Sequence, residues 1–337
     1  MMKKPLKQDY IFLFYILLFF GCASAKTRET ETDSLPGKNI LSIGRTAVSG
    51  ERLELISSAS HFRFSFNGRE CRLAVSLSDW QSHNYLQYEI DGVYQKRIRI
   101  NKNDHQPIII SAEADGQHTV TVYKATEAHT GPIFIQEVTG KNIQTLKPAD
   151  LPLIEFIGNS ITCGAAADPS DVPCGTGVYH DQHNAYYAYG PRVARTLGAN
   201  YVLSSVSGIG IYRNWNSDSP AMPVVYAKAD FQHESNRRWD FKTYQPAVVS
   251  IALGTNDFSN GDGKRQRLPF DSALFVTNYI KFVEQVKSNY PKAQIALLGS
   301  PMVNGERREL LQNCLTAVKK KIDTIFSNDK PVALHFF

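Results

Sequence analysis

Three short segments of the chain combine small residues with hydroxyl and amide side chains in an order that suits acyl transfer. These segments are Gly158-Asn159-Ser160, Ser207-Gly208-Ile209-Gly210 and Gly254-Thr255-Asn256-Asp257. Ser160 is a candidate nucleophile, and a glycine such as Gly208 lets a backbone N–H approach a substrate oxygen closely. The Asn256 side-chain amide offers another donor. Acyl transfer needs donors that bind the developing oxyanion, and one such donor can be worth about 3 kcal/mol of the barrier.

Each of these segments taken singly also fits an ordinary turn after a strand. Combinations such as Gly-x-Ser or Gly-x-Asn-Asp occur often by chance, and Gly208 and Asn256 are common turn residues. Three segments in order, each following an expected parallel strand, form a much more specific pattern. Ligands bind beyond the carboxyl ends of the strands in open α/β sheets, so the three segments would meet at one site.

The second half of the chain alternates apolar runs with helical patterns from Leu151 onward. The runs predict five buried parallel strands, at residues 153–157, 201–206, 247–253, 295–298 and 332–337. The predicted helices run from an Asn184 cap to Leu197 with Gly198 as the stop, from an Asp271 cap to Lys287, and over residues 306–326. This alternation predicts an α/β/α three-layer sandwich with a five-stranded parallel sheet.

The first half of the chain contains short strands that alternate polar and apolar residues. We expect these strands at residues 62–66, 72–77, 85–90, 97–100, 108–111, 118–123 and 133–138. Turn signals separate them, among them Asn67-Gly68 and Asp91-Gly92. Regularly spaced strands without helices predict an all-β sandwich of jelly-roll type. We place the sandwich at residues 26–148 and the α/β domain at residues 149–337.

Composition agrees with two globular domains and excludes several classes of function. The chain has 337 residues, 42% hydrophobic and 20% charged, which is enough apolar content to bury a core. The net charge of 37 − 32 = +5 is too weak to indicate a nucleic-acid partner. The sequence shows no metal-binding cluster, phosphate loop or nucleotide fingerprint, so we expect no cofactor.

Residues 1–25 have the pattern of a secretory signal. Three lysines precede the apolar run from Tyr10 to Phe20, which is too short to span a membrane. Cleavage after Ala23-Ser24-Ala25 would release the protein, whereas a loose lipobox ending at Cys22 would leave that cysteine lipidated. Both alternatives place the protein in a secreted, periplasmic or outer-surface location, with membrane contact only through a lipid anchor.

Four further cysteines lie in a chain whose export route permits disulfides. Cys163 and Cys174 bracket a loop, and either a local bridge or two free thiols fits their spacing, with free thiols preferred. Cys71 and Cys314 are interpreted as core residues.

The three strand-end segments resemble those of the SGNH (GDSL-like) hydrolase superfamily, with Gly158-Asn159-Ser160 in place of Gly-Asp-Ser. This resemblance covers residues 151–337. Residues 118–128 are similar to the last part of the jelly roll that precedes the catalytic domain in family 2 carbohydrate esterases, and residues 207–215 are similar to that family's second block. Together the resemblances cover nearly all of the chain after the leader.

The resemblance implies a serine esterase that removes O-acetyl groups from plant polysaccharides such as xylan or mannan through an acetyl-serine intermediate. By matching motif, Ser160 is the nucleophile, and the Ser160 N–H, the Gly208 N–H and the Asn256 side chain form the oxyanion hole. Trp215 either stacks on a sugar ring or lies in the core. Asp257 is interpreted as a structural hydrogen-bonding residue.

The general base expected from the resemblance is not found. In this superfamily it is a histidine in an Asp-x-x-His segment after the fifth strand, whereas the chain ends in residues 331–337 without such a segment. His335 is interpreted as a core or edge residue, and His180, His183 and His233 as solvated or turn-bonded side chains. We expect a truncated or frameshifted reading of a longer esterase, which as given would lose most turnover.

Two alternatives to the acetyl esterase remain open at this point. One is a non-catalytic carbohydrate-binding surface lipoprotein derived from such an esterase. The other keeps the serine chemistry but acts on other acyl esters, such as lipids or thioesters.

Overall fold

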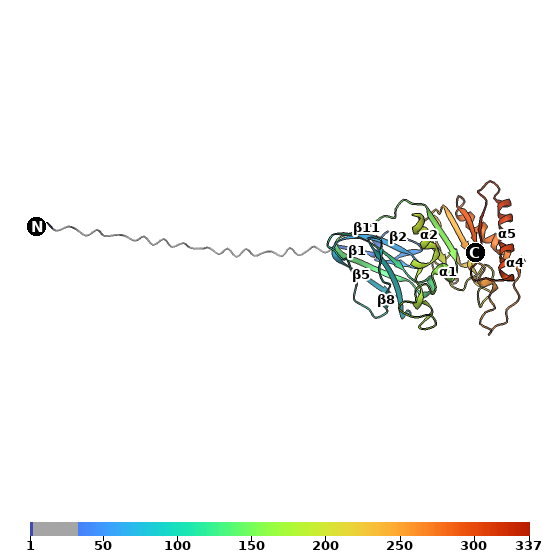
Figure 1. Cartoon of the computed structure of the whole chain (residues 1–337), viewed down its shortest axis with the longest axis horizontal. Helices are drawn as coiled ribbons and strands as arrows, with labels where there is room; N and C mark the ends of the chain where they lie inside the picture. The colour runs from blue at the N-terminus through green and yellow to red at the C-terminus, as the bar shows by residue number, and fades with distance from the viewer. Residues whose placement is uncertain (3–32) are drawn as a thin grey trace. The chain divides into compact units, whose positions relative to one another are not determined.

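A computed structural model describes residues 1, 2 and 33–337. Residues 33–337 lie within one compact unit (Figure 1). The predicted leader, with Cys22 and the alternative cleavage after Ala25, lies outside the described residues. None of the helices in the described part of the chain combines the length and apolar character needed to cross a bilayer.

Residues 33–145 form an antiparallel β domain, which confirms the all-β prediction (blue to green in Figure 1). Its eleven strands in the described chain are β1 Asp33–Pro36, β2 Ser42–Ile43, β3 Thr46–Ser49, β4 Arg52–Leu55, β5 His61–Leu77, β6 His83–Ile90, β7 Val93–Tyr94, β8 Ile98–Asn101, β9 Ile108–Ser111, β10 Gln117–Lys124 and β11 Ile133–Thr145. Two 3₁₀ turns, η1 Gly37–Asn39 and η2 Ala128–Thr130, connect some of them. The four strands before residue 56 were not predicted, because each has at most four residues and none shows a sustained alternation.

The long strand β5 corrects one prediction. Asn67-Gly68 is not a turn between two strands but lies inside this single strand of 17 residues. Gly68 has a φ of +106° and donates its N–H to Gly116, so the chain bends there without reversing. Residues 61–67 pair with β10, and residues 70–73 pair with β9. One strand therefore pairs with β10 before Gly68 and with β9 after it.

The core of the β domain follows the period of two that the sequence shows. Phe62, Phe64 and Phe66 alternate along β5 and are almost completely buried. They pack with apolar residues of β10 and β11, including Val120 and Val138. Burying one such aromatic side chain contributes about 1.5–3 kcal/mol.

The α/β domain has the predicted parallel sheet, in the order β13-β12-β14-β15-β16. Its strands are β12 Leu153–Gly158, β13 Asn200–Ser205, β14 Val248–Ala252, β15 Gln294–Leu298 and β16 Ala333–His335. Its helices are α1 Ser160–Cys163, α2 Tyr189–Leu197, α3 Met222–Val225, α4 Ser272–Asn289 and α5 Glu306–Ile325, with 3₁₀ turns η3 Tyr179–Gln182, η4 Ala185–Tyr187 and η5 Asn256–Phe258. The fold-class prediction is confirmed, although the last strand is shorter than predicted.

The helix ends follow the predicted caps with one exception. Asp271 accepts a hydrogen bond from the Leu274 N–H at 2.9 Å, and Gly198 ends α2 with a φ of +62°. Asn184 was expected to cap that same helix but instead caps the 3₁₀ turn η4. The α-helix starts later, at Tyr189, because Pro191 lacks an N–H and is tolerated only in the first turn.

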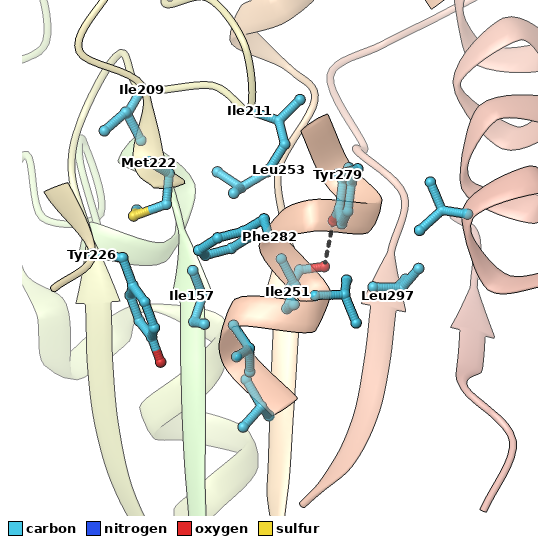
Figure 2. Packing of buried hydrophobic residues seen from close by; sticks show 14 of the residues in the cluster. Ile157, Ile209, Ile211, Met222, Tyr226, Ile251, Leu253, Tyr279, Phe282 and Leu297 are labelled. Atoms are coloured by element: carbon cyan, nitrogen blue, oxygen red, sulfur yellow. Dashed lines mark hydrogen bonds between the residues drawn. The ribbon is translucent and has the colours of Figure 1, made fainter. Parts of the chain in front are cut away.

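Hydrophobic clusters pack on both faces of the parallel sheet. On one face, Tyr279 and Phe282 of α4 lie against Ile157, Ile251 and Leu297 of three neighbouring strands (Figure 2). The Tyr279 hydroxyl also donates a hydrogen bond to the Ile251 carbonyl at 3.4 Å, the dashed line in Figure 2. The other face carries a second cluster that includes α2 and residues of the β domain. The β domain thus helps to cover the sheet that carries the strand-end segments.

The cysteines in the described chain are all free thiols. Cys163 is buried and Cys174 is exposed, so the preferred interpretation of two separate thiols holds and the alternative bridge does not form. Cys71 and Cys314 are buried, as expected of core residues.

The burial of two histidines predicts how the free energy of unfolding depends on pH. Burial lowers the pKa of both His61 and His183 to about 4. In the unfolded chain each imidazole takes up a proton near pH 6.5, whereas in the folded protein it stays neutral down to about pH 4. The unfolded state therefore binds more protons between these values, and the free energy of unfolding falls as the pH drops from about 6.5 to about 4. Each histidine should account for about 3 kcal/mol at pH 4.

Urea unfolding between pH 7 and pH 4.5 measures this dependence. The double variant His61→Gln/His183→Gln should show a flatter profile over that range, and the exposed His233→Gln control should behave like the parent. A double variant whose profile is as steep as that of the parent would contradict the prediction.

Candidate active site

Ser160 stands at the carboxyl end of β12, as the first residue of α1. Gly158 allows this turn because a Cβ there would lie 2.0 Å from Thr162 Oγ1. Asn159 caps the short helix, its side chain accepting a hydrogen bond from the Ile161 N–H at 3.2 Å. These contacts hold the Ser160 side chain, which is half-buried, at the edge of the sheet.

The second strand-end segment supplies a backbone donor. Gly208 has a φ of +75°, and a Cβ at this position would lie 2.5 Å from Trp215 Cδ1, so only glycine fits. The Gly208 carbonyl accepts a hydrogen bond from the Trp215 N–H at 2.8 Å. The Gly208 N–H has no hydrogen-bond partner in residues 33–337 and can donate to a bound molecule.

The third segment contains an amide donor and a structural carboxylate. Asn256 Nδ2 donates to the Ile209 carbonyl at 2.8 Å, and its second N–H is left for a ligand. Asp257 is fully buried and accepts hydrogen bonds from the backbone N–H groups of Ile211 and Tyr212 at 3.0 Å. This position agrees with the interpretation of Asp257 as a structural residue.

The three segments meet at one cavity of about 610 Å³. Its lining residues are Glu127, Ser160, Tyr179, Ser207, Gly208, Trp215, Asn256 and Ser259. Trp215 is 45% exposed here and is not a core residue, which leaves sugar stacking as its remaining predicted role. A neighbouring cavity of about 180 Å³ shares Ser207, Gly208 and Trp215 with the first and adds His129 and Phe231. The two cavities offer room for more than the acyl group alone.

Sequence reasoning missed three residues that line the main cavity, namely Glu127, Tyr179 and Ser259. Glu127 follows β10 in the β domain, and its Oε2 accepts a hydrogen bond from the Ser207 N–H at 2.6 Å. The Tyr179 hydroxyl donates to Ser207 Oγ at 3.1 Å. Burial raises the pKa of Tyr179, while hydrogen bonds with Ser207 and Ser160 act in the opposite direction. Tyr179 therefore stays a neutral hydroxyl beside Ser160.

All nine histidines lie in the described residues, and none of them lines the cavity that contains Ser160. His335 and His233 are exposed, and His180 is half-buried with its ring 4.7 Å from that of His83. His183 contradicts the interpretation of a solvated or turn-bonded side chain, because it is fully buried and neither ring nitrogen has a hydrogen-bond partner in the described chain. Its ring packs edge-on against Tyr179 at 4.8 Å instead.

A group of His83, His180 and Asp181 has the residue types of a metal site, with potential ligand atoms within 4.8 Å of one another. The Asp181 carboxylate already accepts hydrogen bonds from His83 at 2.6 Å and the Tyr85 hydroxyl at 2.8 Å, and Arg99 lies 3.8 Å away. Burial alone would raise the pKa of Asp181, but its hydrogen bonds lower it to about 2. This arrangement fits a hydrogen-bond network between η3 and the β domain better than a cation site.

Replacement of Asn256 tests the side-chain donor. Asn256→Ala should lower kcat for ester hydrolysis by about 10²- to 10³-fold, because the oxyanion loses one preorganised donor. Asn278→Ala, at a half-buried position of α4 that does not line the Ser160 cavity, is the control and should leave kcat unchanged. Steady-state rates with an aryl acetate measure both variants. A loss of less than threefold for Asn256→Ala would exclude this donor from the reaction.

Comparison with known proteins agrees with the geometry of both domains. A family model described as Carbohydrate esterase 2 N-terminal matches residues 42–149, and one described as the GDSL-like Lipase/Acylhydrolase family matches residues 156–327. An acetylxylan esterase / glucomannan deacetylase of Cellvibrio japonicus is 31% identical over 269 residues, covering 77% of this chain and 72% of that protein. The cellulase/esterase CelE of Acetivibrio thermocellus is also 31% identical, over 77% of this chain and 31% of that longer protein.

Solved structures with the same fold include a family two carbohydrate esterase from Clostridium thermocellum in complex with cellohexaose. It has a TM-score of 0.76 and 29% sequence identity, covering 88% of each chain. A carbohydrate esterase family 2 enzyme from Corynascus thermopiles has a TM-score of 0.71 and 27% identity over 88% of each chain. With its GDSL-like domain preceded by the characteristic N-terminal domain, the chain belongs to carbohydrate esterase family 2.

Proposed function

We propose that this protein removes O-acetyl groups from plant polysaccharides such as xylan or glucomannan. The observation that carries the proposal is the cavity in which Ser160 lies together with two oxyanion donors, the Gly208 N–H and the Asn256 amide. The relative from Cellvibrio japonicus is named for deacetylation of these same two polymers. The esterase from Clostridium thermocellum was solved with an oligosaccharide bound, which supports a carbohydrate partner.

The proposed reaction is acyl transfer in two steps. Ser160 Oγ attacks the acetyl carbonyl, and the oxyanion that forms accepts hydrogen bonds from the Ser160 and Gly208 N–H groups and from Asn256. The ester C–O bond then breaks, and the proton that leaves Ser160 ends on the sugar hydroxyl. Water attacks the acetyl-serine in the second step, which releases acetate and restores the serine.

The cavity walls favour an acetylated sugar over a long acyl chain. Tyr179, Ser207 and Ser259 offer hydroxyl groups that can bind sugar hydroxyls, and Trp215 offers an exposed aromatic face. A fatty acyl chain would need a continuous apolar tunnel, whereas this cavity is lined mainly by polar residues. We therefore propose acetyl esters of polysaccharides or oligosaccharides as substrates, rather than lipids or thioesters.

Acetate release from acetylated xylan and acetylated glucomannan tests the proposal, using protein isolated from its natural source. Acetate should be released from at least one polymer, and aryl butyrate and longer aryl esters should react much more slowly than aryl acetate. Polysaccharide binding without acetate release would support the carbohydrate-binding alternative instead. A preference for longer acyl groups would support a hydrolase of other esters.

We further propose that the protein acts outside the cytoplasm. The basic start and apolar run within residues 1–25 support export, and Cys22 is the residue that a lipid anchor would use. The intact mass of the isolated protein separates the alternatives, since a chain that starts at a diacylated Cys22 is heavier than its peptide mass, while one cleaved after Ala25 is not. Retention of residues 1–25 in the isolated protein would refute export by this signal.

A further inference from the structure

We propose that Glu127, a residue of the β domain, is a positioning residue for the oxyanion hole of the α/β domain. Its carboxylate holds the Ser207 N–H and thereby directs the next N–H of the chain, that of Gly208, into the cavity. The inference rests on the proposed function, which identifies the reaction as ester hydrolysis at Ser160. It gives the β domain a direct part in catalysis, beyond covering one face of the sheet.

The geometry around Gly208 shows how one hydrogen bond to Glu127 orients the Gly208 N–H. The peptide that carries the Gly208 N–H lies between two anchored peptides. On one side the Ser207 N–H is bound to Glu127 Oε2 at 2.6 Å, and on the other the Gly208 carbonyl is bound to the Trp215 N–H at 2.8 Å. With both neighbours fixed, the intervening peptide plane keeps one orientation. Without Glu127, the Ser207 end would be free to turn and Gly208 would leave its left-handed conformation more easily.

Glu127 is itself held firmly enough to act as an anchor. It is 4% exposed, and its carbonyl accepts a hydrogen bond from the ammonium group of Lys124. Lys124 is completely buried and also donates to the carbonyl of Thr126 at 3.1 Å. Burial lowers the pKa of Lys124 to about 7, and the nearby Glu127 opposes this change. The carboxylate therefore belongs to a packed polar cluster and not to a mobile surface side chain.

The direction of the carboxylate explains how it can lie near an oxyanion site without opposing the reaction. Glu127 Oε2 is engaged by the Ser207 N–H and also by the Cys163 thiol at 3.4 Å. Cys163 is fully buried, whereas Ser207 is half-buried and lines the cavity. Oε2 is thus occupied by donors of the protein, and no hydrogen bond in residues 33–337 joins Glu127 to the Gly208 N–H, which stays available to a substrate oxygen.

Two substitutions at Glu127 separate positioning from general stability. Glu127→Ala removes the acceptor, and kcat for an aryl acetate should fall by about 10- to 100-fold, somewhat less than when an oxyanion donor is deleted outright. KM should change less than threefold, because substrate binding does not use this bond. Glu127→Gln keeps an oxygen acceptor and should restore kcat to within about fivefold of the parent. A Gln variant as slow as the Ala variant would overturn the proposal, as would an Ala variant with full kcat.

Glu54→Ala is the matched control. Glu54 is another buried carboxylate that reaches from the β domain to the α/β domain, where it accepts hydrogen bonds from Arg237 at 2.7 Å. Its removal should lower stability and leave kcat unchanged, because Glu54 does not line the Ser160 cavity. An equal loss of kcat in the Glu54 and Glu127 variants would mean that any damage to the domain contact slows the reaction, and would overturn the specific role of Glu127.

A readout that needs no turnover keeps this inference separate from the proposed function. Hydrogen exchange of the Ser207 amide, which Glu127 holds, should be faster in Glu127→Ala than in the parent and close to the parent in Glu127→Gln when followed by NMR. Unchanged exchange in the Ala variant would overturn the positioning role even in a protein without esterase activity. Conversely, the parent protein could hydrolyse aryl acetate but release no acetate from either polysaccharide. That result would refute the proposed substrate, and the Glu127 variants could still be compared on aryl acetate.

Discussion

Replacing Ser160 with alanine is expected to lower the rate of acetate release by about 10⁴-fold or more. Ser160 lies at the carboxyl end of β12, in the cavity that Gly208 and Asn256 also line. Without its hydroxyl no acyl-enzyme forms, and only the residual effect of substrate binding and the oxyanion hole remains. The measurement is acetate released from acetylated xylan or glucomannan over time, with parent and variant at equal concentration.

The control for this variant is Ser288→Ala, on the exposed end of α4, which should release acetate at the parent rate. Ser160→Ala should also bind acetylated polysaccharide as tightly as the parent, because removing the hydroxyl takes away a group that reacts and leaves the cavity walls in place. Retained binding with lost turnover would identify Ser160 as the nucleophile. Equal acetate release by parent and variant would show that the reaction takes place elsewhere.

The sequence predicted the convergence of the three strand-end segments for a simple geometric reason. Apolar runs of four to seven residues mark buried parallel strands, and the carboxyl ends of such strands share one edge of the sheet. Ser160, Gly208 and Asn256 follow three of these runs directly, so their order along the chain was enough to place them together. The structure brings all three to one cavity.

Contacts between the two domains could not be predicted in this way. Glu127 and Ser207 are 80 residues apart and follow strands of two different sheets, so no local pattern relates them. His183 illustrates the same limit, because its loop position suggested solvent exposure while the folded chain buries it completely. The turn signal at Asn67-Gly68 failed for a related reason, since pairing with β9, β10 and β11 holds the chain extended on both sides of Gly68. Long-range packing overrides local preference at each of these places.

Arg45 provides the prediction with the largest expected effect on stability. It lies in the β domain, is completely buried, and donates hydrogen bonds to the Tyr226 carbonyl at 2.8 Å and to Ser204 Oγ at 3.1 Å. Its guanidinium also lies 4.1 Å from the ring centre of Phe231. Burial lowers the pKa of Arg45, and the main opposing influence is the carboxylate of Glu155. Arg45→Met should therefore lower the free energy of unfolding by about 3–5 kcal/mol.

Most of the decrease in unfolding free energy should arise because Glu155 stays buried without its cationic partner. Glu155 is buried in β12, where burial raises its pKa and Arg45 acts to lower it. It accepts hydrogen bonds from Ser204 and from the Tyr226 hydroxyl at 2.9 Å, so these neutral donors would be its remaining partners. Without Arg45, Glu155 would be an uncompensated buried charge or would take up a proton. Urea unfolding of the parent, Arg45→Met and Glu155→Gln measures these contributions.

The double variant Arg45→Met/Glu155→Gln then decides whether charge compensation is the cause. If it is, the double variant should be less destabilised than the sum of the two single variants by at least about 1 kcal/mol. Lys96→Met is the matched control, because its pair with Asp171 also joins the two domains but the two side chains are 78% and 29% exposed, and it should lose about 1 kcal/mol or less. Strict additivity would show instead that Arg45 acts through its carbonyl and aromatic contacts. An Arg45→Met protein as stable as the Lys96→Met protein would contradict the prediction, because loss of a fully buried cation should lower stability far more than loss of an exposed one.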